Sequence, residues 1–229
     1  MKLKAIAFDA DDTLWDCQSH FDRVEERYAS ILSPYAAAEQ VGNSLFKTET
    51  GNMPLLGYGC KAFTISLVEN AIAVSGGHIS SDMIAEIIKL GKSLLRIPAT
   101  PLPQVEETLA HLRKHTSFRL AMFTKGELLD QENKLKRSGL SAHFHLVKVV
   151  SDKTREAFLD LCRQLDIAPD ELLMVGNSLR SDVIPALEIG AHAVHIPFHT
   201  TWQHEMIDDF THSDLVTIRH FSELLQICR

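Results

Sequence analysis

The stretch Ile6-Ala7-Phe8-Asp9-Ala10-Asp11-Asp12-Thr13-Leu14 decides how the rest of the chain is interpreted. An apolar run ends here in three acidic residues within four positions, and a threonine follows them. Carboxylates this close repel one another and raise each other's pKa unless a cation or hydrogen bonds compensate. The stretch therefore predicts a magnesium site at the end of a buried strand, where one carboxylate also takes part in chemistry.

The composition of the 229-residue chain is that of an ordinary globular protein, with 45% hydrophobic and 23% charged residues. Its net charge of -7 argues against a general nucleic-acid binder, which would show a basic face. A small phosphorylated ligand stays compatible with this charge, because a metal and one or two lysines can supply local positive charge. The length allows one large domain or a domain with a sizeable insertion.

Membrane and secretory signals are not expected in this sequence. No apolar run approaches the roughly 20 residues that a helix needs to span a bilayer. The run before Asp9 is too short for the core of a signal peptide, so we interpret it as a strand. The chain has four cysteines: Cys17, Cys60, Cys162 and Cys228. Their scattered spacing favours reduced thiols and a cytoplasmic protein, while the oligomeric state is left open.

Residues 17–98 form a block in which helical patterns recur and no strand is convincing. Four apolar residues lie three or four positions apart: Phe21, Val24, Tyr28 and Leu32. Ser80 looks like the cap of a further helix, and the turn-formers of residues 51–59 predict a loop. We predict an all-helical domain over residues 17–98, inserted into a domain made of residues 1–16 and 99–229.

Strand and helix patterns alternate in the remainder of the chain. The predicted strands span residues 3–8, 118–123, 146–150, 171–175 and 192–196, with 215–218 as a sixth at an edge. One intervening helix is predicted to start at Pro103, and another to end at Gly139 as a C-cap. This alternation predicts an α/β fold with a doubly wound, mainly parallel sheet.

Polar residues follow several of the predicted strands. They are Asp9, Asp11, Thr13, Thr124, Lys153, Asn177 and, just beyond, Asp182. In doubly wound sheets the ligand crevice lies outside the carboxyl ends of the strands. We therefore expect these side chains to converge at one edge of the sheet.

With these residues the chain resembles the haloacid dehalogenase (HAD) superfamily of hydrolases, across essentially its whole length. The four motifs of that family occur in order: Asp9-Ala10-Asp11-Asp12-Thr13, then Thr124, then Lys153, then the acidic loop Gly176 to Asp182. A single motif carries a real risk of a false match, but four in order, each after a predicted strand, are a specific signal. The helical insertion is similar to the cap domain that many members carry between the first two motifs.

The resemblance implies a magnesium-dependent phosphatase that acts on a small phosphorylated metabolite. Asp9 would attack phosphorus to form an aspartyl-phosphate, and Asp11 would protonate the leaving oxygen and then activate water. The metal ligands would be the Asp9 carboxylate, the Asp11 backbone carbonyl and the Asp182 carboxylate. Because Asn177, an outer contact, is uncharged, the site would depend strongly on Asp182. The expected phosphate-binding residues are Thr124, Lys125 and Lys153.

The chain departs from the family pattern at three positions. Asp12 stands where glycine is frequent, and Asn177 stands where an acid is common. Thr154 follows Lys153 where proline is frequent, which leaves Lys148 as a rival for the site lysine. Lys148 lies in the middle of a predicted strand, so we expect it to point away from the crevice.

Histidines and an aromatic residue offer further candidate contacts. His192 and His195 are three apart in a predicted strand, so their side chains point to opposite faces, which favours a structural role over a zinc site. Residues 51–59, and Trp202 with His204, are candidates for contact with the substrate, and the sequence does not decide between them.

Three other functions match parts of the pattern. A 2-haloacid dehalogenase shares the fold and the nucleophile, but its halide leaving group needs no proton, so Asp11 counts against it. A receiver-type signalling domain is about half this length and accepts phosphate after its third strand. A non-catalytic phospho-ligand binding protein is disfavoured by the intact acidic and lysine residues of the four motifs.

Overall fold

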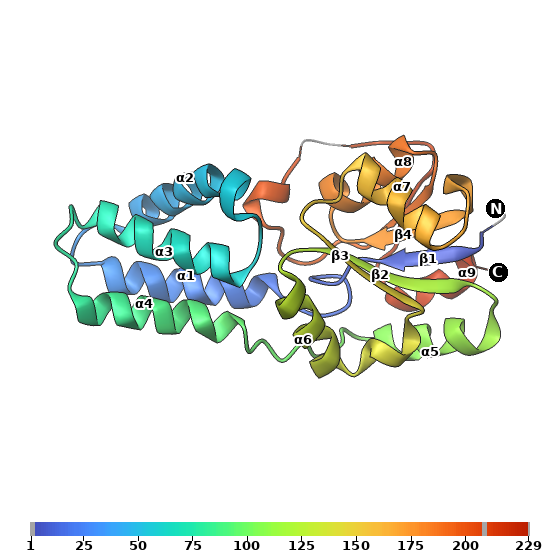
Figure 1. Ribbon diagram of the computed structural model, residues 1–229, viewed down its shortest axis with the longest axis horizontal. Helices are drawn as coiled ribbons and strands as arrows, with labels where there is room; N and C mark the ends of the chain where they lie inside the picture. The colour runs from blue at the N-terminus through green and yellow to red at the C-terminus, as the bar shows by residue number, and fades with distance from the viewer. Residues whose placement is uncertain (1–2, 208–209, 229) are drawn as a thin grey trace. The chain divides into compact units, whose positions relative to one another are not determined.

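A computed structural model describes residues 3–207 and 210–228 of the chain. The chain divides into two compact units, which are Met1–Gln18 with Pro98–Arg229, and Ser19–Ile97. We call them the α/β unit and the helical unit (Figure 1). Within the described ranges, no helix is long and apolar enough to cross a membrane. All four cysteines lie in these ranges, where they are buried and form no disulfide.

The α/β unit is built on a parallel sheet of six strands (Figure 1). The strands are β1 (Ala5–Phe8), β2 (Arg119–Lys125), β3 (Leu146–Val150), β4 (Leu172–Gly176), β5 (His192–His195) and β6 (Leu215–Thr217). Their order is β3-β2-β1-β4-β5-β6, and every neighbouring pair is parallel. This order confirms the predicted doubly wound α/β fold. Since β1 lies between β2 and β4, the residues that follow β1 are flanked by the ends of both neighbours.

The connections of the α/β unit contain helices and single turns. The helices are α5 (Val105–His115), α6 (Leu128–Ser138), α7 (Arg155–Gln164), α8 (Ile184–Glu188) and α9 (Leu224–Ile227). The short turns are η1 (Leu140–His143), η2 (Pro169–Glu171), η3 (Leu179–Val183), η4 (Gln203–Glu205) and η5 (Phe221–Glu223). Gly139 caps α6 with φ 76°, as predicted. The predicted helix start at Pro103 is wrong, because Gln104 has φ 68°, a left-handed conformation that a right-handed helix does not contain.

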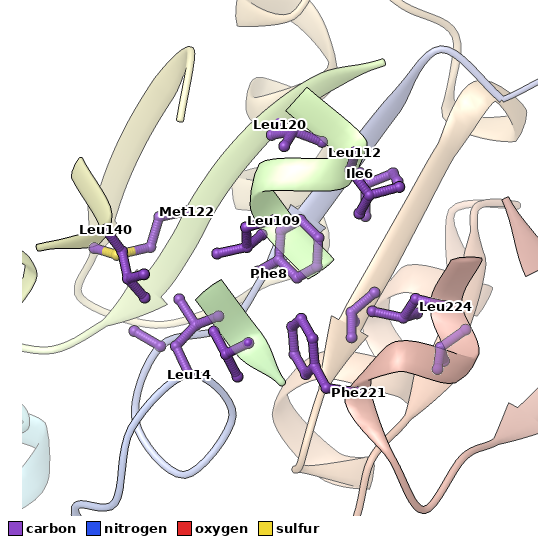
Figure 2. Packing of buried hydrophobic residues seen from close by; sticks show 14 of the residues in the cluster. Ile6, Phe8, Leu14, Leu109, Leu112, Leu120, Met122, Leu140, Phe221 and Leu224 are labelled. Atoms are coloured by element: carbon purple, nitrogen blue, oxygen red, sulfur yellow. The ribbon is translucent and has the colours of Figure 1, made fainter. Parts of the chain in front are cut away.

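Strand side chains alternate between two hydrophobic clusters, one for each face of the sheet. Ile6 and Phe8 of β1 join the cluster that includes residues of α5 and α9, where Phe8 stacks on Phe221 with ring centroids 5.8 Å apart (Figure 2). Ala5 and Ala7 join the opposite cluster, together with residues of α7 and α8. A strand covered on both faces is apolar throughout, which explains why a continuous apolar run predicts β1 correctly.

The helical unit is formed by α1 (Gln18–Leu32), α2 (Ala38–Leu56), α3 (Cys60–Val74) and α4 (Ser81–Leu94). Residues 19–97 are all described and contain no strand, as predicted. Ser80 caps α4, since its hydroxyl oxygen accepts a hydrogen bond from the Met83 N–H at 3.2 Å. Tyr28 of α1 donates to the carbonyl of Leu67 on α3 at 2.8 Å.

The predicted loop over residues 51–59 is wrong for most of its length. Residues 51–56 continue α2, and only the last three residues connect α2 to α3. The Asn52 side-chain amide donates to Ser66 at 3.1 Å and to Glu69 at 2.8 Å, both on α3. These contacts between helices favour the helical conformation over the local turn preference, which is only a weak influence.

Candidate active site

Asp9 is the first residue after the central strand β1. Its backbone N–H continues the sheet pattern by donating to the Val175 carbonyl of β4 at 2.9 Å. Only 7% of the residue is exposed. The sheet therefore fixes the Asp9 backbone, and it holds a carboxylate in a largely buried position at the carboxyl end of the strands.

Asp9, Lys153 and Asp182 form a buried cluster, which we call the Lys153 cluster. The Lys153 ammonium donates to Oδ1 of Asp9 and, at 2.6 Å, to Oδ1 of Asp182. The Lys153 and Asp182 side chains are each 1% exposed. Three of the predicted site residues, from three separate motifs, are thus in direct contact.

Lys153 reaches the cluster from the segment between β3 and α7. The next residue, Thr154, is the N-cap of α7, and its hydroxyl oxygen accepts from the Ala157 N–H at 3.2 Å. A capping threonine therefore starts the helix where the family often has proline. The rival Lys148 forms an ion pair with Asp160 of α7, so it does not join the cluster.

Asp182 reaches the cluster from η3, which is a single π-helical turn. Such turns contain one extra residue per turn and are frequent at functional sites. The second carboxylate oxygen of Asp182 accepts from the Ser178 N–H at 3.0 Å. A Cβ atom at Gly176 would lie only 2.1 Å from that oxygen, so the close approach of Asp182 requires glycine at the end of β4.

The Lys153 cluster holds two carboxylates against one ammonium. Burial and the Asp182 charge, opposed by Lys153, together raise the pKa of Asp9 to about 7. Burial also raises the pKa of Asp182, again opposed by Lys153. For Lys153, burial alone would lower the pKa, but the two carboxylates raise it. With both carboxylates ionised, the cluster would therefore carry one negative charge more than Lys153 balances.

Thr13 and Asn177 connect the loops after β1 and β4. The Asn177 N–H donates to the Thr13 hydroxyl at 3.0 Å. The same hydroxyl lies 3.2 Å from Asn177 Oδ1 and 3.4 Å from Asp9 Oδ2, and its single proton serves one of them at a time. His195 of β5 contacts the Asn177 carbonyl at 2.9 Å. Thr13 thus holds two loops of the site together.

The Asp11 carboxylate lies in a second cluster with Lys134, Gln131 and Trp15, which we call the Lys134 cluster. The Lys134 ammonium donates to both Asp11 oxygens, at 2.8 and 2.7 Å. The Trp15 indole N–H donates to Oδ1 at 2.7 Å, and the Gln131 amide donates to Oδ2 at 2.9 Å. Asp130 is the other nearby acid, with 3.6 Å between its Oδ2 and the Lys134 ammonium.

The electrostatics of Asp11 are opposite to those of Asp9. Burial alone would raise the pKa of Asp11, but the Lys134 charge and the three hydrogen-bond donors lower it overall. Burial alone would lower the pKa of Lys134, but Asp11 raises it, with smaller contributions from Cys17 and Asp130. Asp11 is consequently an ionised carboxylate at neutral pH in this structure.

Asp12, the third acid of the stretch, shapes the turn. Its φ is 61°, the left-handed region, which explains why glycine suits this position as well. One oxygen of Asp12 accepts from the backbone N–H groups of Cys17 and Gln18, at 2.8 and 2.9 Å. Burial raises the pKa of Asp12 to about 7, and these two hydrogen bonds oppose the shift.

Thr124 and Lys125 lie at the carboxyl end of β2. Thr124 is 1% exposed. The Lys125 ammonium forms an ion pair with Glu205, donates to Ser181 at 2.9 Å and lies 5.5 Å from the centre of the Trp202 ring. Burial alone would raise the pKa of Glu205, but Lys125 lowers it overall. Trp202 is therefore close to the end of β2, whereas the Lys125 charge is already paired.

The oxygen donors of the Lys153 cluster are those that Mg²⁺ prefers, since hard cations bind carboxylates, carbonyls and water. Two carboxylates with unbalanced charge, held at the end of a sheet, are suited to such a cation. Over residues 3–207 and 210–228, no group of three or more histidine, cysteine or acidic side chains is arranged to hold a metal. The Asp11 side chain is turned toward Lys134, so its role as a metal ligand through the backbone carbonyl stays a prediction.

Sequence reasoning missed Lys134, Gln131 and Glu205. A signal for the first two exists in α6, where the buried face carries Asp130, Gln131, Lys134, Leu135 and Ser138. Polar side chains at helical spacing on a buried face indicate a specific partner, because buried polar groups need hydrogen bonds. No comparable local pattern marks Glu205, which pairs with a residue 80 positions earlier in the numbering.

Comparisons with known proteins find relatives over nearly the whole chain. The sequence model of the haloacid dehalogenase-like hydrolase family matches residues 3–190. Glyceraldehyde 3-phosphate phosphatase from Methanothermobacter thermautotrophicus is 25% identical over 98% of this chain and 99% of that protein. The crystal structure of a haloacid dehalogenase-like family hydrolase from Xanthomonas campestris has a TM-score of 0.89 and 30% identity, covering 99% of this chain and 91% of that one.

The structure of L-2-haloacid dehalogenase from Xanthobacter autotrophicus is also similar, with a TM-score of 0.69, 16% identity and coverage of 99% and 98% of the two chains. This likeness shows the fold alone. The family model covers most of the chain and spans the residues of both lysine clusters. The chain therefore belongs to the haloacid dehalogenase-like hydrolase family.

Proposed function

We propose that this protein is a magnesium-dependent phosphatase that hydrolyses a small phosphomonoester through an aspartyl-phosphate on Asp9. The observation that carries the proposal is the Lys153 cluster, in which Asp9 and Asp182 meet at one buried ammonium. Phosphoryl transfer asks mainly for positioning and for charge stabilisation, and this cluster offers a fixed nucleophile beside a fixed cation. The full-length similarity to a phosphatase supports the same reaction class.

Asp9 and Asp182 are the carboxylates that would hold Mg²⁺, with the Asp11 backbone carbonyl as a third oxygen and Asn177 beyond them. When bound, the cation would neutralise charge on the phosphoryl oxygens. The raised pKa of Asp9 and Asp182 fits this assignment, because a bound cation would favour the ionised forms that burial disfavours.

The chain's own residues divide the reaction between them. An Asp9 oxygen bonds to phosphorus as the ester P–O bond breaks, and the leaving oxygen takes a proton from Asp11. Lys153 and Thr124 hold phosphoryl oxygens. A water oxygen then bonds to phosphorus, the bond to Asp9 breaks, and Asp11 takes the water proton. Although Asp11 is ionised at rest, the negative charge of a bound phosphoryl group raises its affinity for the proton that it needs in the first step.

The alternative reaction in this fold is hydrolysis of a 2-haloacid. A halide leaves without a proton, so that reaction has no use for a general acid. In this chain, three side chains donate hydrogen bonds to Asp11 and fix it beside the loop of the nucleophile. This arrangement supports the phosphatase over the dehalogenase.

The proposal is tested by phosphate release from p-nitrophenyl phosphate with and without Mg²⁺. We expect activity only with Mg²⁺, and we expect Asp9→Asn to lower it by several orders of magnitude. Asp12→Asn is the matched control in the same loop, since asparagine tolerates the left-handed conformation and keeps an accepting oxygen. Activity that survives Asp9→Asn, or chloride release from 2-chloropropionate without phosphate release, would contradict the proposal.

We further propose that the helical unit acts as the cap and selects the substrate, because the site residues described above recognise only the phosphoryl group. The panel to screen comprises phosphorylated sugars, including glyceraldehyde 3-phosphate, together with nucleotides and phosphoglycolate. Tyr58 lies in the connection between α2 and α3. We expect Tyr58→Ala to change the order of preference within this panel while activity on p-nitrophenyl phosphate is retained. An unchanged order of substrate preference would count against a role of this connection in substrate selection.

A further inference from the structure

Lys134 is a buried lysine whose main partner is the proposed general acid and base. Its side chain is 3% exposed, while the Asp11 side chain keeps 27% of its exposure. The three residues that donate to Asp11 are thus buried, while part of the Asp11 side chain stays accessible. Lys134 contacts both carboxylate oxygens, so rotation of the Asp11 side chain would break at least one strong hydrogen bond.

Trp15 and Gln131 add two further constraints on the same carboxylate. The Trp15 backbone is fixed, because its carbonyl accepts from the Asp12 N–H at 2.7 Å, and its indole N–H points back to Asp11. The Gln131 amide donates both to Asp11 and to the Lys125 carbonyl at the end of β2, at 3.1 Å. The Gln131 carbonyl oxygen is buried without a hydrogen-bond partner in the described structure, so this side chain is held only through its amide nitrogen.

Stability alone does not explain this arrangement. A buried ion pair costs so much desolvation that well-packed apolar residues in its place are often neutral or stabilising. The buried face of α6 nevertheless carries a lysine and a glutamine at the positions that contact Asp11. A requirement for one orientation of Asp11 explains these residue types, because the four hydrogen bonds reach it from three side chains on two segments.

We propose that Lys134, assisted by Gln131 and Trp15, is a positioning residue that holds the Asp11 carboxylate in the orientation needed for proton transfer to the leaving oxygen. This inference rests on the proposed phosphatase function. Lys134 does not touch the reacting atoms, and it acts only through Asp11. In the first step, which ends with cleavage of the ester bond, its contribution is consequently needed only when the leaving group needs a proton.

The test compares two classes of leaving group in the full-length protein with Mg²⁺. An alkyl phosphate, such as glycerol phosphate, releases a basic alkoxide that needs a proton, whereas p-nitrophenyl phosphate releases a stable phenolate. The parameter is kcat/KM, which reports the steps up to cleavage of the ester bond. For Lys134→Met we expect a loss of about 100-fold with the alkyl ester, within the range for general acid catalysis, and about threefold or less with the aryl ester.

Three further variants make the result specific. Lys134→Arg keeps the charge and should restore part of the alkyl activity. Asp11→Asn should show the same selectivity as Lys134→Met, and adding Lys134→Met to Asp11→Asn should cause no further loss, because residues that act through one another are not additive. Lys136→Met is the matched control, since Lys136 lies on the exposed face of the same helix and should behave as wild type.

Equal losses for both esters in Lys134→Met, or additive losses in the double variant, would overturn the proposal. If Lys134→Met does not fold, Trp15→Phe decides, because it removes the indole N–H donor and keeps a smaller aromatic ring. We expect a selective loss of several-fold with the alkyl ester, and an equal loss with both esters overturns the proposal. A wild-type protein inactive on every phosphomonoester would instead refute the proposed function. If Asp11→Asn loses activity selectively with the alkyl ester and the Lys134 variants do not, this inference is refuted while the proposed function stands.

Discussion

The two lysine clusters of the α/β unit place similar groups in opposite electrostatic states. In the Lys153 cluster, the ammonium contacts one oxygen of each carboxylate, and the pKa of both Asp9 and Asp182 is raised. In the Lys134 cluster, the ammonium contacts both oxygens of Asp11, two neutral donors complete the set, and the pKa of Asp11 is lowered. Both lysines are almost fully buried.

The difference comes from the charges and hydrogen bonds around each carboxylate rather than from burial, since Asp9 has the Asp182 charge beside it and Asp11 has more donors. Among the residues that the structure describes, the Asp9 carboxylate has, besides Lys153, only a long contact of 3.4 Å with the Thr13 hydroxyl. Asp11 has four contacts of 2.9 Å or less from three side chains. A cluster with too few donors is suited to an added cation, while a fully satisfied carboxylate is suited to one fixed orientation. The comparison explains how two aspartates separated by one residue can have different roles.

The largest expected effect on stability is the loss of Lys134. Lys134→Met leaves Asp11 and Asp130 without their cation, and breaking a buried pair in this way costs about 3–5 kcal/mol. Lys153→Met should cost less at neutral pH, because Asp9 already takes up a proton near pH 7. Urea unfolding of both variants at pH 7 without Mg²⁺ measures the difference, with Lys136→Met as the control. A larger loss of stability for Lys153→Met than for Lys134→Met would contradict this prediction.

Neutralising each aspartate in turn should change stability in opposite directions. Asp11→Asn weakens hydrogen bonds to a charged group and should destabilise the protein by about 1.5–3 kcal/mol. Asp9→Asn removes excess buried negative charge and should raise the melting temperature in the absence of Mg²⁺. Thermal unfolding at pH 8 checks both signs, and destabilisation by both variants would show that the Lys153 cluster is already balanced.

Mg²⁺ should stabilise the protein through the Lys153 cluster and not through the Asp11 side chain. At a concentration 100 times the dissociation constant, a ligand of the native state adds about 2.7 kcal/mol. We expect Mg²⁺ to raise the melting temperature of the wild type and of Asp11→Asn, but not that of Asp182→Asn. Loss of the Mg²⁺ effect in Asp11→Asn would mean that its carboxylate, rather than its backbone, belongs to the metal site.

The smallest expected effect is a pH dependence of stability without Mg²⁺. The pKa of Asp9 is raised from 3.8 to about 7, so between these values the folded protein binds more protons than the unfolded chain. This contribution is present at low pH and is lost as the pH rises through about 7. As the pH rises from 6 to 8, the wild type should therefore lose stability relative to Asp9→Asn, by on the order of 1 kcal/mol. A difference that does not vary with pH would exclude a raised pKa for Asp9.

Much of the α/β unit could be predicted because its signals are local. A continuous apolar run, a cap residue or a helical stripe depends on neighbours within a few positions, and parallel strands bring their carboxyl ends to one edge. For this reason Asp9, Lys153 and Asp182 could be named together from the sequence. The extent of α2 could not be predicted, because the contacts of Asn52 with α3 cannot be recognised from the turn-forming residues around it.

The sequence by itself determined the parallel sheet, the order of the four motifs and the residues that follow the strands. Only the tertiary structure decided which cation each aspartate faces. Asp11 and Lys134 are 123 positions apart, and Lys125 pairs with Glu205, 80 positions later in the chain. The physical reason is that the pKa of a buried carboxylate depends on the donors around it, and those donors are brought together only when the chain is folded.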